Sequence, residues 1–201
     1  MRKSGFIRRQ QATNFAPAIR LAEKTGRPLN YLITLNYSDT ACAPEAASAA
    51  FARLRDNHFG PWYRRPKKGV LPPTQPAAFI WVIENTSVIA AHWLVHIPDG
   101  RLTDFTAHLE KWLIKTTGGV HFMANALNIR GVYNVAGVRL YMLKGIDPMY
   151  GPFYGVRPID QGVVHGKRFG FSESLGRSKC REARTYHRQI VADRAALKTA
   201  A

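Results

Sequence analysis

The sequence predicts an α+β fold in which helices pack on a central, mainly antiparallel β-sheet. Three observations carry this prediction. Short segments rich in strand-forming residues alternate with segments of helical periodicity. Two of the strand-like segments are separated only by the short polar connection 85–87, which suits an antiparallel hairpin. The 201 residues, 46% of them hydrophobic, are enough for one domain with a proper core.

The first half of the chain predicts an arm, a strand, a helix and a loop, in that order. Residues 1–29 contain seven Lys and Arg and show no clear period, so we expect a basic N-terminal arm that includes a short helix around residues 16–24. Residues 31–37 are rich in strand formers. A helix should open at Pro44 and stop near Gly60. Four prolines and four positive charges then predict a loop over residues 64–76.

The second half predicts a hairpin followed by alternating helices and strands. The hairpin strands are expected at residues 79–84 and 92–97. Apolar residues at 105, 109, 112 and 113 lie on one side of a helix over 102–115. A strand at 120–126, a helix at 135–144 and a final basic helix at 179–198 should follow. The expected organisation is therefore the arm 1–29, one domain over 30–178 and a basic C-terminal helix over 179–201.

The charge of the chain predicts a polyanionic partner. There are 29 Lys and Arg against 13 Asp and Glu, a formal net charge of +16. Such an excess favours nucleic acid through release of counterions. No run of about 18 apolar residues and no signal peptide is visible, so we expect a cytoplasmic protein without a membrane partner. Cys42 and Cys180 lack the spacing of a zinc site and are expected to be structural thiols.

Two histidines in an apolar strand, His92 and His96, raise the question of a metal site. Residues four apart on a strand lie about 13 Å from each other, whereas a metal lies about 2 Å from each imidazole nitrogen. The two histidines therefore cannot share one ion. Glu84 ends the preceding strand and faces His92 across the short connection, so this pair could hold a divalent cation or could be a buried histidine satisfied by a carboxylate. For His96 we expect structural burial.

A second pattern, Tyr141-Met-Leu-Lys144, places a phenol and an ammonium three residues apart on a helix. A nearby ammonium favours the phenolate, and a phenolate can attack a phosphodiester to form a covalent phosphotyrosine. The pattern is short, and a tyrosine is also a common core residue. Its value depends on whether Tyr141 meets the Glu84 and His92 pair.

Taken in order, these segments resemble the HUH endonuclease family, the tyrosine nucleases that include rolling-circle replication initiators. The strand 32–37 is similar to the family's first motif, and Tyr141 and Lys144 match its Tyr-x-x-Lys motif. The middle motif, His-hydrophobe-His, departs from the pattern, because Ala90 stands in the first histidine position and His92 in the second. The resemblance covers about residues 30–175.

That resemblance implies a ferredoxin-like sheet and a single-strand DNA endonuclease that works through a covalent 5′-phosphotyrosine. It implies Tyr141 as nucleophile, Lys144 as its companion, and Glu84 and His92 as ligands of Mg²⁺ or Mn²⁺. The replacement at Ala90 would weaken the metal site or abolish cleavage. A non-catalytic nucleic-acid-binding protein on the same scaffold, acting as an autoregulator or binding RNA, stays open as the alternative.

Two basic segments mix cations with aromatic residues, as proteins that bind single strands do. They supply the expected DNA contacts Arg64, Arg65, Lys67, Lys68, Lys167, Arg168 and Phe169. Either segment could equally be a solvated basic loop beside a core aromatic. Tyr186 is the second choice for the nucleophile. The expected partner is single-stranded or hairpin DNA, and a host helicase would have to unwind a duplex because no P-loop motif is present.

Overall fold

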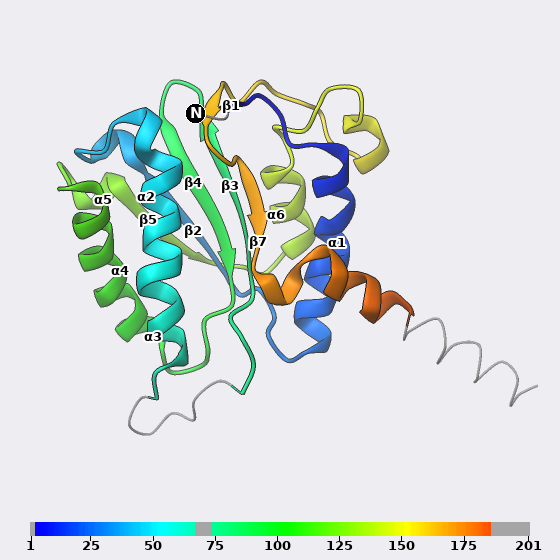
Figure 1. Cartoon of the computed structure of the whole chain (residues 1–201), viewed down its shortest axis with the longest axis horizontal. Helices are drawn as coiled ribbons and strands as arrows, with labels where there is room; N and C mark the ends of the chain where they lie inside the picture. The colour runs from blue at the N-terminus through cyan, green and yellow to red at the C-terminus, as the bar shows by residue number, and fades with distance from the viewer. Residues whose placement is uncertain (1–2, 67–73, 186–201) are drawn as a thin grey trace, which may run out of the picture.

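A computed structural model of the chain describes residues 3–66 and 74–185, and its centre is a five-stranded antiparallel sheet (Figure 1). The strand order is β5-β2-β4-β3-β7. The strands are β2 (Tyr31–Asn36), β3 (Phe79–Asn85), β4 (Ile89–Val95), β5 (Leu127–Gly131) and β7 (Phe169–Phe171). Helices connect β2 to β3 and β4 to β5. If β2, β3, β4 and β5 are counted as strands 1 to 4 of this sheet, their spatial order is 4-1-3-2, which is the ferredoxin-like order. The α+β prediction is confirmed, and β7 extends the sheet beside β3.

One face of the sheet is covered by the helices that connect its strands. After a 3-10 turn at Pro44–Ala46, α2 (Ala47–Arg53) continues through a widened π-type segment, Leu54–Phe59, into α3 (Gly60–Arg64). The predicted stop at Gly60 is wrong, because Pro61 lies in the first turn of α3, where its missing N–H costs no helical hydrogen bond. The helix α4 (Leu102–Thr117), as predicted, lies beside it. Aromatic rings fill the interface, with Phe59 and Trp93 edge to face at 4.7 Å.

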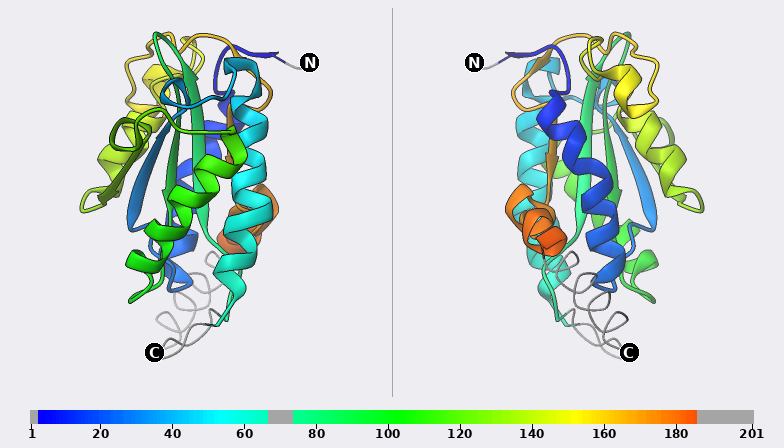
Figure 2. Two further views of the ribbon diagram at one scale, coloured as in Figure 1. Left: turned by 90° about the vertical axis from the view of Figure 1, so that its left-hand side faces the viewer. Right: turned by 90° about the vertical axis from the view of Figure 1, so that its right-hand side faces the viewer.

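The opposite face carries a second core beneath α1 (Arg9–Lys24) and α6 (Val135–Met142) (Figure 2). The structure contradicts the separate arm over residues 1–29, because α1 buries Phe15 and Ile19 against the sheet residues Ile80 and Leu94. The buried positions of α1 recur with helical spacing over 12–22, and its basic residues lie largely on the outer side. The N-terminal segment is part of the domain.

Other boundaries differ from the prediction or extend it, and the second hairpin strand, predicted at 92–97, is β4 at Ile89–Val95. The strand expected at 120–126 is instead β5, beginning at Leu127 after the short helix α5 (Met123–Ala126). A small second sheet pairs β1 (Lys3–Ser4) with β6 (Val164–His165). Residues 177–185 are helical, and the rest of the predicted C-terminal helix lies outside the described residues. Further 3-10 turns occupy Tyr37–Asp39, Gly151–Tyr154 and Glu173–Leu175.

Helix length and composition also bear on the membrane prediction. Within residues 3–66 and 74–185, no helix combines the length and the apolar character that crossing a bilayer requires.

Candidate active site

The centre of the sheet brings the predicted acid and histidine together. In the β3–β4 hairpin Glu84 lies opposite Ala90, and His92 follows two residues later on the same face. From the other side, β2 places Asn36 opposite Ala90 and Thr34 opposite His92. Alternation along each strand directs these side chains away from the aromatic core and toward the face that α1 and α6 cover.

The helix α6 supplies the remaining two predicted residues. Its first turn is capped by Asn134, whose side-chain oxygen accepts a hydrogen bond from the backbone N–H of Gly137 at 3.0 Å. Tyr141 lies in its last turn, and Lys144 follows shortly after its end. The Tyr141 hydroxyl oxygen is 3.0 Å from Nε2 of His92. The Lys144 ammonium is 2.9 Å from Oε2 of Glu84 and 4.1 Å from the centroid of the Tyr141 ring.

The imidazole of His92 is at the centre of this network. Its Nδ1 is 3.1 Å from Oγ1 of Thr34, and its Nε2 is 3.2 Å from Oε2 of Glu84. With the proton on Nδ1, the ring donates to Thr34 and leaves Nε2 to accept the Tyr141 hydroxyl proton; with the proton on Nε2, the ring donates to Glu84. The ring is thus held from one side and faces both the acid and the phenol from the other.

The electrostatics of the site depend on the charge of Glu84. Burial alone raises the pKa of this carboxyl, but the hydrogen bonds and charges of His92 and Lys144 outweigh that effect, and its pKa lies below the ordinary value of 4.5. Glu84 is therefore an anion at neutral pH. Its neighbour Tyr141 is 41% exposed, so the phenol is both fixed on its inner side and open to a substrate on its outer side.

The same residues can be tested as holders of a divalent ion. Glu84 keeps one oxygen, Oε1, that is buried and has no hydrogen-bond partner among the described residues, and His92 adds an imidazole nitrogen beside it. No group of three or more His, Cys, Asp or Glu side chains suited to a metal forms within the described part of the chain. Since Mg²⁺ often keeps several waters and binds through one or two carboxylates, two protein donors fit an ion that is held weakly.

A hollow beside the site contains residues that the sequence reasoning missed. It has a volume of about 710 Å³ and lies along β2 and β5, next to Tyr141 and His92. Its polar lining includes Thr34, Asn36, Asn128 and Arg130, and the Asn36 amide donates to the Asp39 carboxylate. The signal for Thr34 and Asn36 is present in the sequence, because they alternate with the core residues of β2. Asn128 could not be found in the same way, because β5 was expected too early.

The other predicted residues lie elsewhere. His96 follows β4, where its Nδ1 is 2.9 Å from the carbonyl oxygen of Pro28 and burial lowers its pKa, which agrees with a structural role. Arg64 and Arg65 are exposed at the end of α3. Lys67, Lys68 and Tyr186 lie outside the described residues.

The segment 167–169 proves to be only partly suited to DNA contact. Lys167 is exposed, but Arg168 is 2% exposed and donates to the carbonyl oxygens of Ser4, Gln161 and Gly162. Phe169 is buried against Phe15, with ring centroids 5.6 Å apart. The expectation that Arg168 and Phe169 bind DNA is corrected, because both side chains are occupied by the fold.

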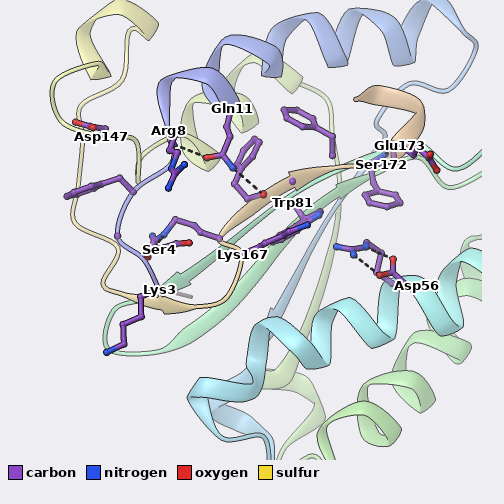
Figure 3. A pocket seen from close by; sticks show the side chains of 18 residues that line it. Lys3, Ser4, Arg8, Gln11, Asp56, Trp81, Asp147, Lys167, Ser172 and Glu173 are labelled. Atoms are coloured by element: carbon purple, nitrogen blue, oxygen red, sulfur yellow. Dashed lines mark hydrogen bonds and ion pairs between the residues drawn. The ribbon is translucent and has the colours of Figure 1, made fainter. Parts of the chain in front are cut away.

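Lys167 does border a large hollow of about 740 Å³ at the β7 edge of the sheet (Figure 3). Trp81 lies along its floor, Gln11 approaches from α1, and Arg8 approaches from the position just before that helix. Cations and acids are mixed around it: Asp56, Asp147 and Glu173 line it together with the basic residues. This mixture makes the hollow a weaker candidate for a polyanion than its size suggests.

The chain was compared with family models and with curated protein sequences. No family model matches the chain, and no curated protein sequence matches it.

Proposed function

We propose that this protein nicks single-stranded or hairpin DNA by attack of Tyr141 on a phosphodiester, as rolling-circle initiators of the HUH type do. One observation carries the proposal. The Tyr141 hydroxyl meets His92 at 3.0 Å, and His92 in turn meets Glu84 at 3.2 Å, although the three residues come from separate elements. A phenol that served only to fill a core would be buried, whereas Tyr141 is partly open to solvent.

The reaction balances without a further reactant. The Tyr141 oxygen forms a bond to phosphorus and loses its proton, and the bond from phosphorus to the 3′ oxygen breaks. The leaving oxygen takes up a proton and becomes a free 3′ hydroxyl, while the 5′ phosphate stays on the tyrosine. The reverse attack by a 3′ hydroxyl releases the enzyme and joins the strand.

Each side chain has a part in this reaction. Without an ion, His92 Nε2 accepts a hydrogen bond from the Tyr141 hydroxyl, because the Thr34 hydroxyl can hold the tautomer that leaves this nitrogen unprotonated. If the ion binds at Nε2, that nitrogen cannot also take the phenolic proton, which then passes to solvent on the exposed side of Tyr141. Lys144, close to both the Tyr141 ring and Glu84, supplies positive charge beside the forming phenolate. The polar hollow with Asn128 and Arg130 offers contacts for the strand next to the scissile phosphate.

The proposal includes a divalent ion, Mg²⁺ or Mn²⁺, held by Glu84 and His92. When bound, such an ion polarises the scissile phosphate and stabilises charge on its oxygens. Ala90 lies opposite Glu84 and two residues from His92, so the replaced position points at the same place. We therefore expect the ion to bind more weakly than it would with a second histidine at position 90. Exposure of the single strand from a duplex would fall to a host helicase.

The first test is covalent capture. Labelled single strands are incubated with the protein and Mn²⁺, and a protein–DNA adduct is sought by denaturing electrophoresis. We expect the adduct to vanish in Tyr141→Phe and to persist in Tyr133→Phe, because Tyr133 is a fully exposed tyrosine in the loop before α6. An adduct that survives Tyr141→Phe would place the nucleophile elsewhere.

The second test restores the altered motif. Ala90→His should increase Mn²⁺-dependent nicking and Mn²⁺ affinity, because it adds an imidazole beside Glu84 and His92. Ala90→Gln is the matched control, since it adds polar bulk without a strong ligand. Equal nicking and equal metal affinity in both variants would contradict the proposed alignment of the motif.

A second candidate function is non-catalytic nucleic-acid binding on the same scaffold. Two features favour it: an alanine at position 90 and a Glu84 oxygen already paired with Lys144. It predicts steeply salt-dependent binding with no adduct for any strand, with or without Ala90→His. The capture experiment separates the two candidates.

A further inference from the structure

A basic groove lies between α1 and the helix at residues 177–185, away from the Tyr141 site. It has a volume of about 550 Å³. In the right-hand view of Figure 2, α1 runs between α6 and this C-terminal helix, so the groove is on the far side of α1 from α6. The lining residues are Arg9, Gln10, Thr13, Asn14, Arg177, Arg181, Arg184 and Thr185.

Helical spacing explains how the arginines come together. Arg177, Arg181 and Arg184 are separated by four and three residues, so they lie on one side of the C-terminal helix. The carboxylate of that helix, Glu182, points elsewhere and pairs with Lys179 at 3.0 Å. Arg9 joins them from the first turn of α1.

These four guanidinium groups have little that would neutralise them. Among the described residues, no carboxylate lines the groove, and the ion pairs that form there involve other side chains. Arg184 donates through Nε to the carbonyl oxygen of Cys180, and the Arg9 guanidinium lies 5.4 Å from the centroid of the Tyr150 ring. Both contacts leave guanidinium N–H groups free. All four arginines are exposed.

Four neighbouring positive charges repel one another, and this repulsion destabilises the folded protein. An anion bound between the four guanidinium groups would relieve the repulsion. Guanidinium groups bind phosphate oxygens through two parallel N–H bonds, and they do so better than lysines. Arg177 and Arg184 are about 10 Å apart along the helix axis. That span equals about three base-pair steps at about 3.4 Å each on one DNA strand.

The lining also indicates which form of DNA binds. Proteins that grip single strands offer aromatic faces for the bases, whereas among the residues that the structure describes no aromatic side chain lines this groove. Contacts to phosphate alone suit a paired backbone. We propose that the groove between α1 and residues 177–185 binds the phosphate backbone of duplex DNA.

Such a groove adds a second nucleic-acid contact that is independent of strand cleavage. A duplex held on this side of α1 would keep a flanking region of DNA on the protein while a single strand reaches Tyr141 on the other side. Duplex binding by the groove does not require the nicking reaction, so it can be measured in the Tyr141→Phe protein. Failure of the nicking proposal would leave this measurement unchanged.

The experiment compares two charge-removing variants of the full chain. Arg177→Gln/Arg181→Gln removes two charges from the groove, and Lys111→Gln/Lys115→Gln removes two exposed charges from α4 on the opposite side. Affinity for a 20-base-pair duplex is measured between 50 and 200 mM salt. Each phosphate contact contributes about 0.9 to the slope of log K against log salt, so loss of two contacts should make the slope of the groove variant shallower by about 1.8. Over this fourfold range of salt, the fold loss of affinity in the groove variant should therefore be about twelve times smaller than the fold loss in the parent.

Four results would overturn the proposal. The slope could stay unchanged in the groove variant, or fall equally in the α4 variant, and either outcome would mean that the groove makes no specific contact with duplex. An equal fall with a 20-nucleotide oligo(dT) would show that the groove does not select paired DNA. Loss of binding to phosphatidylserine vesicles without any loss of duplex binding would make the groove a membrane-docking surface instead.

Discussion

Replacement of Lys144 by methionine should destabilise the protein by about 2 to 3 kcal/mol at pH 7. The Lys144 ammonium is 2.9 Å from Oε2 of Glu84, and the Glu84 side chain is 8% exposed. Methionine keeps most of the volume of the side chain and removes its charge. The carboxylate of Glu84 then stays buried with His92 as its remaining contact partner among the described residues.

The magnitude follows from the burial of the two partners. Removing one partner of a fully buried ion pair typically costs about 3 to 5 kcal/mol, because the other charge is left uncompensated. Lys144 is 21% exposed at its side chain, so water already solvates part of the ammonium. His92 also remains next to Glu84, and both features place the expected cost below the fully buried range.

The pH dependence has a definite sign. The pKa of Glu84 is below its ordinary value of 4.5 in the folded state, so its stabilising effect is complete above that value. The effect is lost as the pH falls from 4.5 through the folded pKa and the carboxylate is protonated. The difference in unfolding free energy between the parent and Lys144→Met should therefore be largest near neutral pH and shrink in acid.

Urea denaturation in EDTA at pH 7, 5, 4 and 3 measures both effects. Lys111→Met, at an exposed position of α4, controls for loss of a surface lysine and should change stability by less than about 0.5 kcal/mol. The double variant with Glu84→Gln should lose less than the sum of the single variants, since the two groups interact. A Lys144→Met protein that matches the Lys111→Met control, or whose deficit is the same at pH 7 and pH 3, would refute the reasoning.

Three further substitutions test the surroundings of the sheet by urea denaturation. Gly170→Ala should lower the free energy of unfolding by about 1 to 3 kcal/mol, because the added Cβ would lie 2.7 to 2.8 Å from ring atoms of Trp81. An unchanged stability would show that β7 can shift away from the ring. Tyr37→Phe should be neutral or stabilising by up to about 1 kcal/mol, because the Tyr37 hydroxyl is buried without a partner among the described residues, and a clear loss would reveal an unseen partner. Arg168→Met should lower the free energy of unfolding by about 2 to 4 kcal/mol, because three buried carbonyl groups lose their hydrogen-bond donor. The control Lys167→Met should be nearly neutral, and equal losses of stability in the two variants would contradict the burial of Arg168.

Strand and helix periods predicted the two halves of the candidate site, whereas the meeting of Tyr141 with His92, which are 49 residues apart in the chain, was expected only from the resemblance to the HUH family. The hairpin spacing placed Glu84 near His92, and the four-residue separation excluded His96 as a partner in the same metal site. The Tyr-x-x-Lys spacing put Tyr141 and Lys144 on one side of α6. These are local rules, and each operates within about fifteen residues.

Residues whose partners are distant in the chain could not be placed in the same way. Arg168 looked like a surface cation in a basic segment, but its hydrogen-bond partners include Ser4, more than 160 residues away. Residues 1–29 looked like an arm because their many charges obscured the buried face of α1, whose contacts are on β3, β4 and β7. Charge density in a segment does not reveal which side of it faces a core.

The packing of the N-terminal segment also connects the fold to the chemistry. Ile7 donates its N–H to the carbonyl oxygen of Gly145 at 2.9 Å and accepts a hydrogen bond from the N–H of Asp147 at 3.1 Å, so it holds the chain directly after Lys144. Tyr141 and Lys144 stand at the end of a helix only eight residues long, and a helix of that length has little stability of its own. Their positions over Glu84 and His92 thus depend on the segment that the sequence presented as an arm. For the same reason, removal of residues 1–29 would disturb the position of Tyr141 through the fold, in addition to removing Arg9 from the groove beside residues 177–185.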